Sequence, residues 1–153
     1  MTMRAEVEKL IGAVLDEADC INDLTDAMRE QREAMRERDT EAINELMNET
    51  RDISFEVQQY EALRNDIAKK LASKFSCEPK VSSLASIMSE EERKQFDEAA
   101  EKLKQSVFVL KSEIMIISGL IDQNEKYTSM LLSEWRRLNG DEITKSGSAD
   151  FRG

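Results

Sequence analysis

The sequence has no histidine, and only two cysteines, one proline and five glycines among its 153 residues. Without histidine it lacks the commonest general base and the commonest metal ligand, and a bundle-type di-iron site, which needs Glu-x-x-His pairs, is excluded. Cys20 and Cys77 are too few for a disulfide framework or a thiolate zinc site. We therefore expect no metal and no cofactor, and two free thiols, as is usual in cytosolic proteins.

Catalytic motifs and basic surfaces are also missing. The sequence has no phosphate-binding glycine loop, no serine-nucleophile motif and no isolated carboxylate pair in glycine-rich or aromatic surroundings, so we do not expect an enzyme. Its formal net charge is −10. Such an acidic balance disfavours nucleic acid, which attracts a basic face, and it disfavours an anionic membrane surface equally.

Long apolar runs are absent as well. The apolar stretch IMIISGLI at residues 114–121 is far shorter than the ~20 residues that span a bilayer. Charges interrupt the N-terminal region, which therefore does not resemble a secretory signal peptide. We expect a cytoplasmic protein without membrane insertion.

Helix-forming and charged residues make up much of the chain: 35% of the residues are charged, and the few turn formers favour long helices. Apolar residues recur at heptad spacing. We predict an all-α fold, in which an antiparallel helical hairpin and a long third helix form a coiled-coil-like bundle. The expected segments are helices at about 3–36, 40–75 and 90–139, a short helical turn at about 82–88, and a flexible tail at 141–153 after a single domain at 1–140.

Local signals mark where these helices begin and end. Asp39 is the predicted N-cap of the second helix, after a tight reversal near Arg38. Pro79 ends that helix, because proline disfavours helical structure at its own position and at the preceding residue. Ser89 and Glu92 have the spacing of a capping box and start the third helix.

The hairpin also fixes where the cysteines lie. With a turn near residue 38, Cys20 lies opposite about residue 56, which leaves Cys77 ~30 Å away along the second helix. Disulfide Cα atoms lie within about 7 Å of each other. We therefore predict that the two cysteines are not paired.

The predicted third helix is longer than the hairpin beside it. About 50 residues give it a length of ~75 Å, against ~50 Å for each hairpin helix. If it runs parallel to the first helix, it draws level with the hairpin tip near Asn124, and the residues beyond have no partner in the chain. Three outcomes would bury them: a break near Gly119 that folds the helix back, dimerisation of two chains, or docking of a partner helix.

The predicted partner-binding residues lie on this overhang and on the turns before it. They are Ile117, Leu120, Ile121, Asn124, Tyr127, Leu131, Leu132, Trp135 and Leu138. Their apolar members would supply burial, whereas Asn124 either fixes the register of a helix pair or faces water.

A run of acids lies between Leu10 and Met28 without any Lys or Arg. It consists of Asp16, Glu17, Asp19, Asp23 and Asp26. We interpret it as a solvated helix face, which is more common than the alternative, an acidic docking patch for a basic partner.

Several phrases are similar to those of a known family. The layout of RERDTEAI, EALRNDIAKKLA, SSLASIM and LIDQNEKYTSMLLSEWRRLNG resembles the FlgN family over nearly the whole chain, to about Gly140. The stretch EALRNDIAKKLA is similar to the family's charged stretch with an Arg late in the second helix. The stretch DQNEKYTSMLL is similar to the family's Asn followed by a Leu-rich turn. The tail KSGSADFRG departs from the family, because Phe151 stands where a tyrosine is common.

The resemblance implies a small cytoplasmic chaperone of flagellar type III export. Such proteins bind the hook-associated proteins FlgK and FlgL before secretion, through helical terminal segments of the cargo, and the C-terminal helix is where cargo docks. Components of the export apparatus are a further partner to consider. The alternative is a structural coiled-coil module that forms a homodimer and has no chaperone activity.

Overall fold

The computed structural model describes residues 3–121, and this part of the chain is helical without any strand. The prediction of an all-α bundle is confirmed. The four helices are α1 at Met3–Glu37, α2 at Thr40–Lys74, α3 at Val81–Ser86 and α4 at Glu90–Ile121. None of them has the length and apolar character that crossing a membrane requires.

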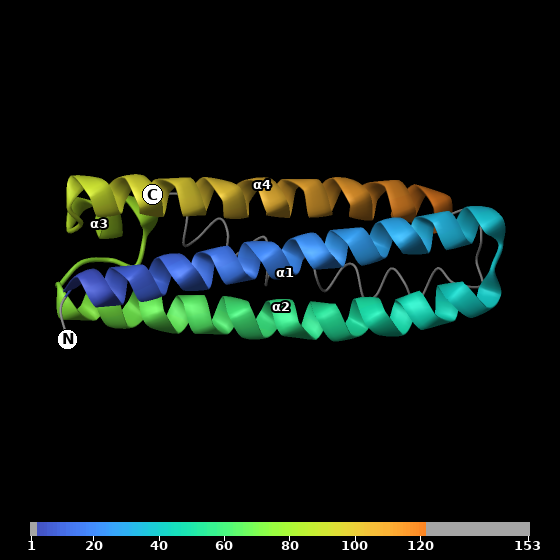
Figure 1. The fold of residues 1–153 in the computed structure, drawn as a ribbon, viewed down its shortest axis with the longest axis horizontal. Helices are drawn as coiled ribbons and strands as arrows, with labels where there is room; N and C mark the ends of the chain where they lie inside the picture. The colour runs from blue at the N-terminus through green and yellow to red at the C-terminus, as the bar shows by residue number, and fades with distance from the viewer. Residues whose placement is uncertain (1–2, 122–153) are drawn as a thin grey trace.

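Helix α1 occupies the middle of the arrangement (Figure 1). It forms an antiparallel hairpin with α2 on one side and packs against α4 on the other. Helix α2 brings the chain back to the end where α1 began, and α3 lies at that end. Helix α4 starts there and runs parallel to α1. The predicted tail at 141–153 and the last 18 residues of the predicted third helix, at 122–139, lie outside the described residues.

The hairpin turn is built by two residues. Arg38 has a positive φ of 57°, which reverses the chain directly after α1. The backbone N–H of Asp39 donates to the Ala34 carbonyl over 3.0 Å, and the Asp39 carboxylate accepts from the Ala42 N–H over 3.1 Å. Asp39 thus satisfies one of the unpaired donors at the start of α2, as predicted.

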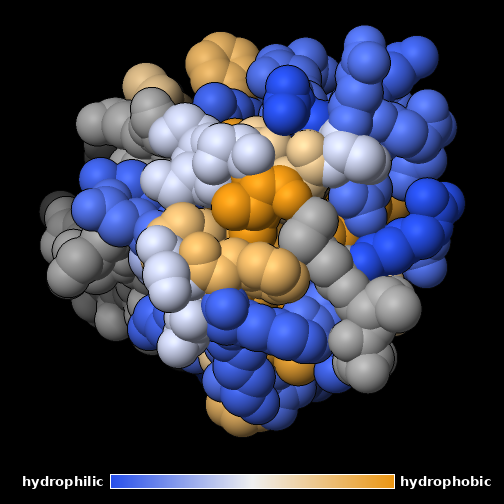
Figure 2. All heavy atoms as spheres, turned by 90° about the vertical axis from the view of Figure 1, so that its left-hand side faces the viewer, coloured by the Kyte–Doolittle hydropathy of each residue, from blue (hydrophilic) through white to orange (hydrophobic). Residues whose placement is uncertain are grey.

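The opposite end of the bundle is closed by a loop and α3. Residues 75–80 leave α2, and α3 packs on the start of α4. Half-buried apolar side chains of this region pack against the core; they are Phe75, Cys77, Val81, Ala85 and Ile87. Figure 2 views the molecule onto this end, where apolar residues gather in the middle between hydrophilic ones.

The predicted capping box at the start of α4 is confirmed. The Glu92 carboxylate accepts from the Ser89 N–H over 2.9 Å, and the Ser89 hydroxyl accepts from the Glu92 N–H over 3.2 Å. These reciprocal bonds satisfy two donors that the first helical turn leaves open. The direction in which α4 leaves α3 is thereby fixed.

The core follows the heptad pattern of α1. Its largest fully buried side chains include Leu10, Ile21, Leu24 and Met28 from α1. Because α1 has a partner on each side, its buried face is wider than a simple coiled-coil seam, and small residues such as Ala13, Ala18 and Ala27 are buried as well. Small side chains let neighbouring helices approach α1 closely.

The register of the hairpin agrees with the sequence estimate. The Cys20 thiol lies 3.9 Å from Oε2 of Glu56 and 4.0 Å from the Ile53 carbonyl oxygen. Both cysteines are free, so the prediction that they are not paired is confirmed. Cys20 is buried, whereas Cys77 is half-buried in the loop after α2.

A buried ion pair joins the two arms of the hairpin. Arg64 is 1% exposed and Glu17 is 2% exposed. The Arg64 Nε–H donates to Oε1 of Glu17, Nη2 donates to Oε2 over 3.5 Å, and Nη1 donates to Oδ1 of Asn65 over 3.3 Å. A charge buried away from water is tolerated when it is paired in this bidentate way.

This pair corrects the interpretation of the acidic run on α1. Asp16, Asp19, Asp23 and Asp26 are exposed, as a solvated face requires, but Glu17 is not. Glu17 lies on the core stripe of α1, and Arg64 of α2 neutralises it there. The Arg in the stretch EALRNDIAKKLA therefore has a structural partner across the hairpin.

Replacing Arg64 is expected to destabilise the protein strongly. Arg64→Ala leaves the buried Glu17 carboxylate without its counter-charge, which costs about 3–5 kcal/mol of unfolding free energy. Urea unfolding followed by circular dichroism measures the loss. The matched control is Lys70→Ala, which removes an exposed pair with Asp66 and should cost less than about 1 kcal/mol. Equal losses in the two variants would contradict a stabilising role for the buried pair.

The two thiols should differ sharply in reactivity. Burial first, and then the negative charges of Glu56, Asp23 and Glu17, raise the pKa of the Cys20 thiol to about 12. At pH 8.5 its thiolate fraction is then below about one in a thousand, and the thiolate is the reactive form. Iodoacetamide should modify Cys77 in the native protein and spare Cys20 until denaturant is added. Mass spectrometry after timed quenching decides this, and equal native rates would show the prediction to be wrong.

Candidate functional site

Two ion pairs fix the position of α4 along α1. Nζ of Lys102 lies 3.1 Å from Oδ1 of Asp19, and Nε of Arg32 lies 3.1 Å from Oε1 of Glu113. The paired residues are 83 positions apart in the first case and 81 in the second. Extending this offset places the hairpin turn near the end of α4, and Figure 1 shows the described end of α4 just short of that turn. The sequence estimate of Asn124 lies outside the described residues.

The inner face of α4 belongs to the core. Phe96, Leu103, Leu110, Ile114 and Ile117 are buried along its length. They follow the alternating spacing of three and four residues that keeps one stripe facing a neighbouring helix. This stripe holds α4 on α1, and it continues as far as Ile117.

The outer face of α4 changes character along the helix. In its first half, exposed positions are polar or charged, as at Lys94, Glu98, Glu101 and Gln105. From Phe108 onward the exposed positions are apolar. The large side chains there are Phe108 at 71% exposed, Val109 at 39%, Met115 at 73% and Ile116 at 46%.

These residues form one continuous surface, which we call the outer apolar face: Phe108, Val109, Ser112, Met115 and Ile116. Positions 108, 112 and 115 are four and three residues apart, so they lie on the same side of the helix, and 109 and 116 flank them. The Ser112 hydroxyl donates to the Phe108 carbonyl over 3.1 Å. Its polar group is therefore turned toward its own backbone, and the half-buried Lys111 borders the face beside Phe108 and Met115.

The stretch IMIISGLI is apolar because it serves both sides of α4. Ile114 and Ile117 point into the core, whereas Met115 and Ile116 are exposed. The helix continues through Gly119 to Ile121, so it has no break at Gly119. Gly119 is exposed, and apart from its own stretch of helix no atom lies within 4 Å of the place where a Gly119 side chain would begin.

The predicted partner-binding residues fall into three groups. Ile117 is 0% exposed and belongs to the core, and Leu120 is half-buried. Ile121 is the last residue of α4, and the structure describes its backbone but not its side chain. The remaining predicted residues also lie outside the described part of the chain: Asn124, Tyr127, Leu131, Leu132, Trp135 and Leu138. Their role in binding stays a prediction.

Sequence reasoning missed the outer apolar face. The signal was present, because Phe108 and Met115 are seven residues apart and stand outside the stripe that contains Leu110, Ile114 and Ile117. A second apolar stripe on one helix predicts a second contact surface. It was obscured because in residues 114–121 the two stripes merge into one apolar run.

The outer apolar face offers burial to a partner. A contiguous apolar surface without charges, on a helix whose other side is already packed, is typical of a protein–protein contact. In residues 3–121, no group of three or more His, Cys, Asp or Glu side chains is placed to hold a metal ion. The arrangement therefore supports recognition of an apolar helix or strand.

Comparison with known proteins gives one finding. A family model described as FlgN protein matches residues 1–145, which is nearly the whole chain. No curated protein and no solved structure matches the chain significantly.

Proposed function

The chain belongs to the FlgN family of flagellar export chaperones, and from this premise we propose that it binds hook-associated proteins of the hook–filament junction, of the FlgK and FlgL type, before their secretion. The family is one of chaperones and not of enzymes. The protein would act in the cytoplasm by covering a helical terminal segment of its cargo, which would otherwise be exposed to aggregation.

The outer apolar face of α4 carries this proposal. A chaperone of this kind needs apolar surface that is available before cargo arrives, and Phe108 and Met115 are each more than two-thirds exposed. An apolar helix of the cargo can lie along α4 with its side chains between those of the face, as in helix-in-groove recognition. The formal net charge of −10 keeps the chaperone soluble despite this exposed surface.

Energetics indicate that the site extends beyond Ile121. Fully burying four large apolar side chains yields ~6–12 kcal/mol, and less for side chains that are already partly covered. Association costs roughly 4–15 kcal/mol in lost translational and rotational freedom. The outer apolar face alone would therefore bind weakly, so we propose that the site continues along the sequence after α4.

The continuation comprises the residues predicted from the sequence. Ile117 and Leu120 would support the site from within α4. The proposed contacts beyond them are Ile121, Asn124, Tyr127, Leu131, Leu132, Trp135 and Leu138. The buried stripe of α4 is described as far as Ile117, and the proposed contacts follow it in the sequence.

The double variant Phe108→Asp with Met115→Asp should weaken cargo binding at least about tenfold, because each substitution places a charge in a surface that cargo would desolvate. Melting should be unchanged, since both side chains are exposed in the free protein. Calorimetry with a purified hook-associated protein measures the affinity, and circular dichroism measures the fold.

Gln95→Asp combined with Gln105→Asp is the matched control for this variant. It adds the same charge to exposed positions of α4 outside the outer apolar face, and it should bind cargo with wild-type affinity. If both double variants bind equally well, cargo does not use the outer apolar face. If neither they nor the wild type bind cargo, and sedimentation instead reveals a concentration-dependent dimer, the structural dimerisation module is the better assignment.

Leu131→Asp combined with Leu138→Asp tests the continuation of the site separately. We expect cargo binding to be abolished while helicity and melting are largely retained, because in this proposal both leucines contact cargo and not the core. The single tryptophan, Trp135, provides an independent signal, since its emission should shift to the blue when cargo excludes water from it. Unfolding of the variant would place these leucines in the chain's own core and contradict the proposal.

A further inference from the structure

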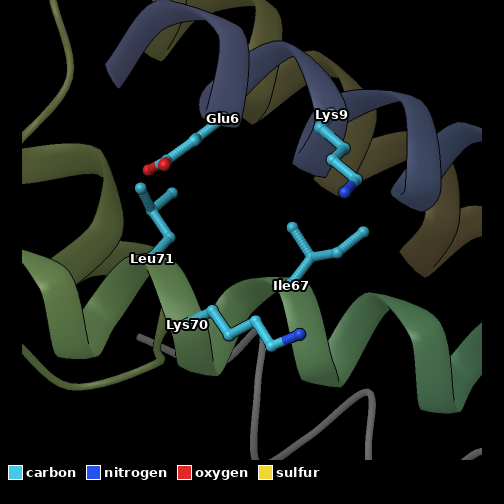
Figure 3. A pocket seen from close by; sticks show the side chains of 5 residues that line it. All are labelled: Glu6, Lys9, Ile67, Lys70 and Leu71. Carbon is cyan, nitrogen blue, oxygen red and sulfur yellow. The ribbon is translucent and has the colours of Figure 1, made fainter. Parts of the chain in front are cut away.

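A small pocket lies between the start of α1 and the end of α2, at the end of the hairpin opposite its turn (Figure 3). It is lined by Glu6, Lys9, Ile67, Lys70 and Leu71, and its volume is about 130 Å³. Cavities of ~150 Å³ lined by apolar groups accommodate a benzene molecule. The pocket is therefore large enough for one apolar side chain, such as leucine or phenylalanine, of a binding partner.

The pocket combines an apolar wall with cationic groups at its edge. Ile67 and Leu71 belong to the hydrophobic core and present apolar atoms to the opening. Figure 3 shows the Lys9 side chain reaching from α1 toward Ile67, while Lys70 extends along α2. The two ammonium groups thus come from different helices and flank the same apolar wall.

Both ammonium groups are accessible to a partner carboxylate. Within residues 3–121, Lys9 takes part in no ion pair. Lys70 pairs with Asp66 over 3.0 Å, but both side chains are exposed, and such pairs contribute little, so Lys70 can exchange partners readily. The one acid of the pocket, Glu6, is already neutralised by Lys74, whose Nζ lies 2.8 Å from Oε1.

The surroundings add to this positive character. The stretch KKLASKFSCEPK places four lysines within twelve residues of a chain whose net charge is −10; they are Lys69, Lys70, Lys74 and Lys80. On α1, the exposed Glu8 is paired with Arg4 over 3.1 Å, and the run of exposed aspartates begins farther along the helix at Asp16. A negatively charged partner approaching this acidic protein is therefore attracted to this group of lysines.

We propose that this pocket binds an acidic segment of a partner protein. One apolar side chain of that segment packs against Ile67 and Leu71, and carboxylates on either side of it pair with Lys9 and Lys70. The site is distinct from the outer apolar face, because Lys9 lies 23 residues before Arg32, the residue level with Glu113, or ~35 Å along α1. Cargo and an acidic partner can thus be held at the same time.

A synthetic peptide provides the test. The probe is acetyl-Glu-Glu-Leu-Phe-Glu-Glu-amide, titrated into the isotope-labelled full-length protein and followed by two-dimensional NMR. Shifts should be confined to residues around the pocket, and the affinity should fall as salt is added. Lys9→Glu combined with Lys70→Glu should weaken binding about tenfold or more, because attraction becomes repulsion at both edges.

Two controls separate the pocket from general electrostatics. Lys94→Glu combined with Lys104→Glu changes the net charge equally at exposed positions of α4 and should leave the affinity nearly unchanged. A peptide with two alanines in place of Leu-Phe should bind at least about tenfold more weakly, since it cannot fill the apolar pocket. Equal binding by the two charge variants, or by the two peptides, would overturn the proposal.

The variant Phe108→Asp with Met115→Asp makes this test independent of the proposed cargo function. It should bind the acidic peptide with wild-type affinity, whether or not it binds a hook-associated protein. Loss of peptide binding in this variant would place the peptide on α4 and would also overturn the pocket as its site.

Discussion

The structure depends on α1 being buried on two sides at once. Helices α2 and α4 each pack along it, so the register of both partners is set by one sequence of side chains. Large residues such as Ile21 and Met28 fill the interfaces, and alanines between them let both neighbours approach. The remaining exposed strip of α1 is narrow and acidic, because its other faces are already covered. This shared helix explains why α4 lies in register with the hairpin although a loop and α3 separate it from α2.

Polar pairs supply positional information that apolar packing does not. A heptad seam is nearly periodic, and a shift by seven residues would still bury leucines and isoleucines. The Glu17–Arg64 pair breaks this periodicity, because a shifted hairpin would leave two buried charges unpaired. Lys102 with Asp19 and Arg32 with Glu113 mark the register of α4 in the same way. Of these three pairs only the first is fully buried, so the hairpin is specified more strongly than the docking of α4.

The sequence was sufficient to predict where the described helices begin because the signals for them are local. Asp39, Ser89 and Glu92 act on backbone groups within one turn, and heptad spacing reports a buried stripe whatever it packs against. Pro79 is less informative, because α2 already ends at Lys74, five residues before it. Glu17 was misinterpreted because its environment is not local: it follows Asp16 in an acidic run, and its partner is 47 residues away. Its place between Val14 and Ile21, three and four residues distant, was the available evidence that it lies on the core stripe. The pocket beside Lys9 could not be predicted, because its lining depends on which turns of α1 and α2 face each other.

Helix α4 can carry a binding surface without loss of stability because its inner and outer sides use different residues. The inner stripe of α4 is complete without Phe108 or Met115, so the core does not require the outer apolar face, and a partner that covers this face need not disturb the core. In IMIISGLI alternating pairs of residues serve the two purposes, with Ile114 and Ile117 inside and Met115 and Ile116 outside. The inner stripe is buried against the chain's own core as far as Ile117, and the outer apolar face remains exposed beside it. A cargo helix is the partner that the proposed function supplies for this face and for the apolar residues that follow α4 in the sequence.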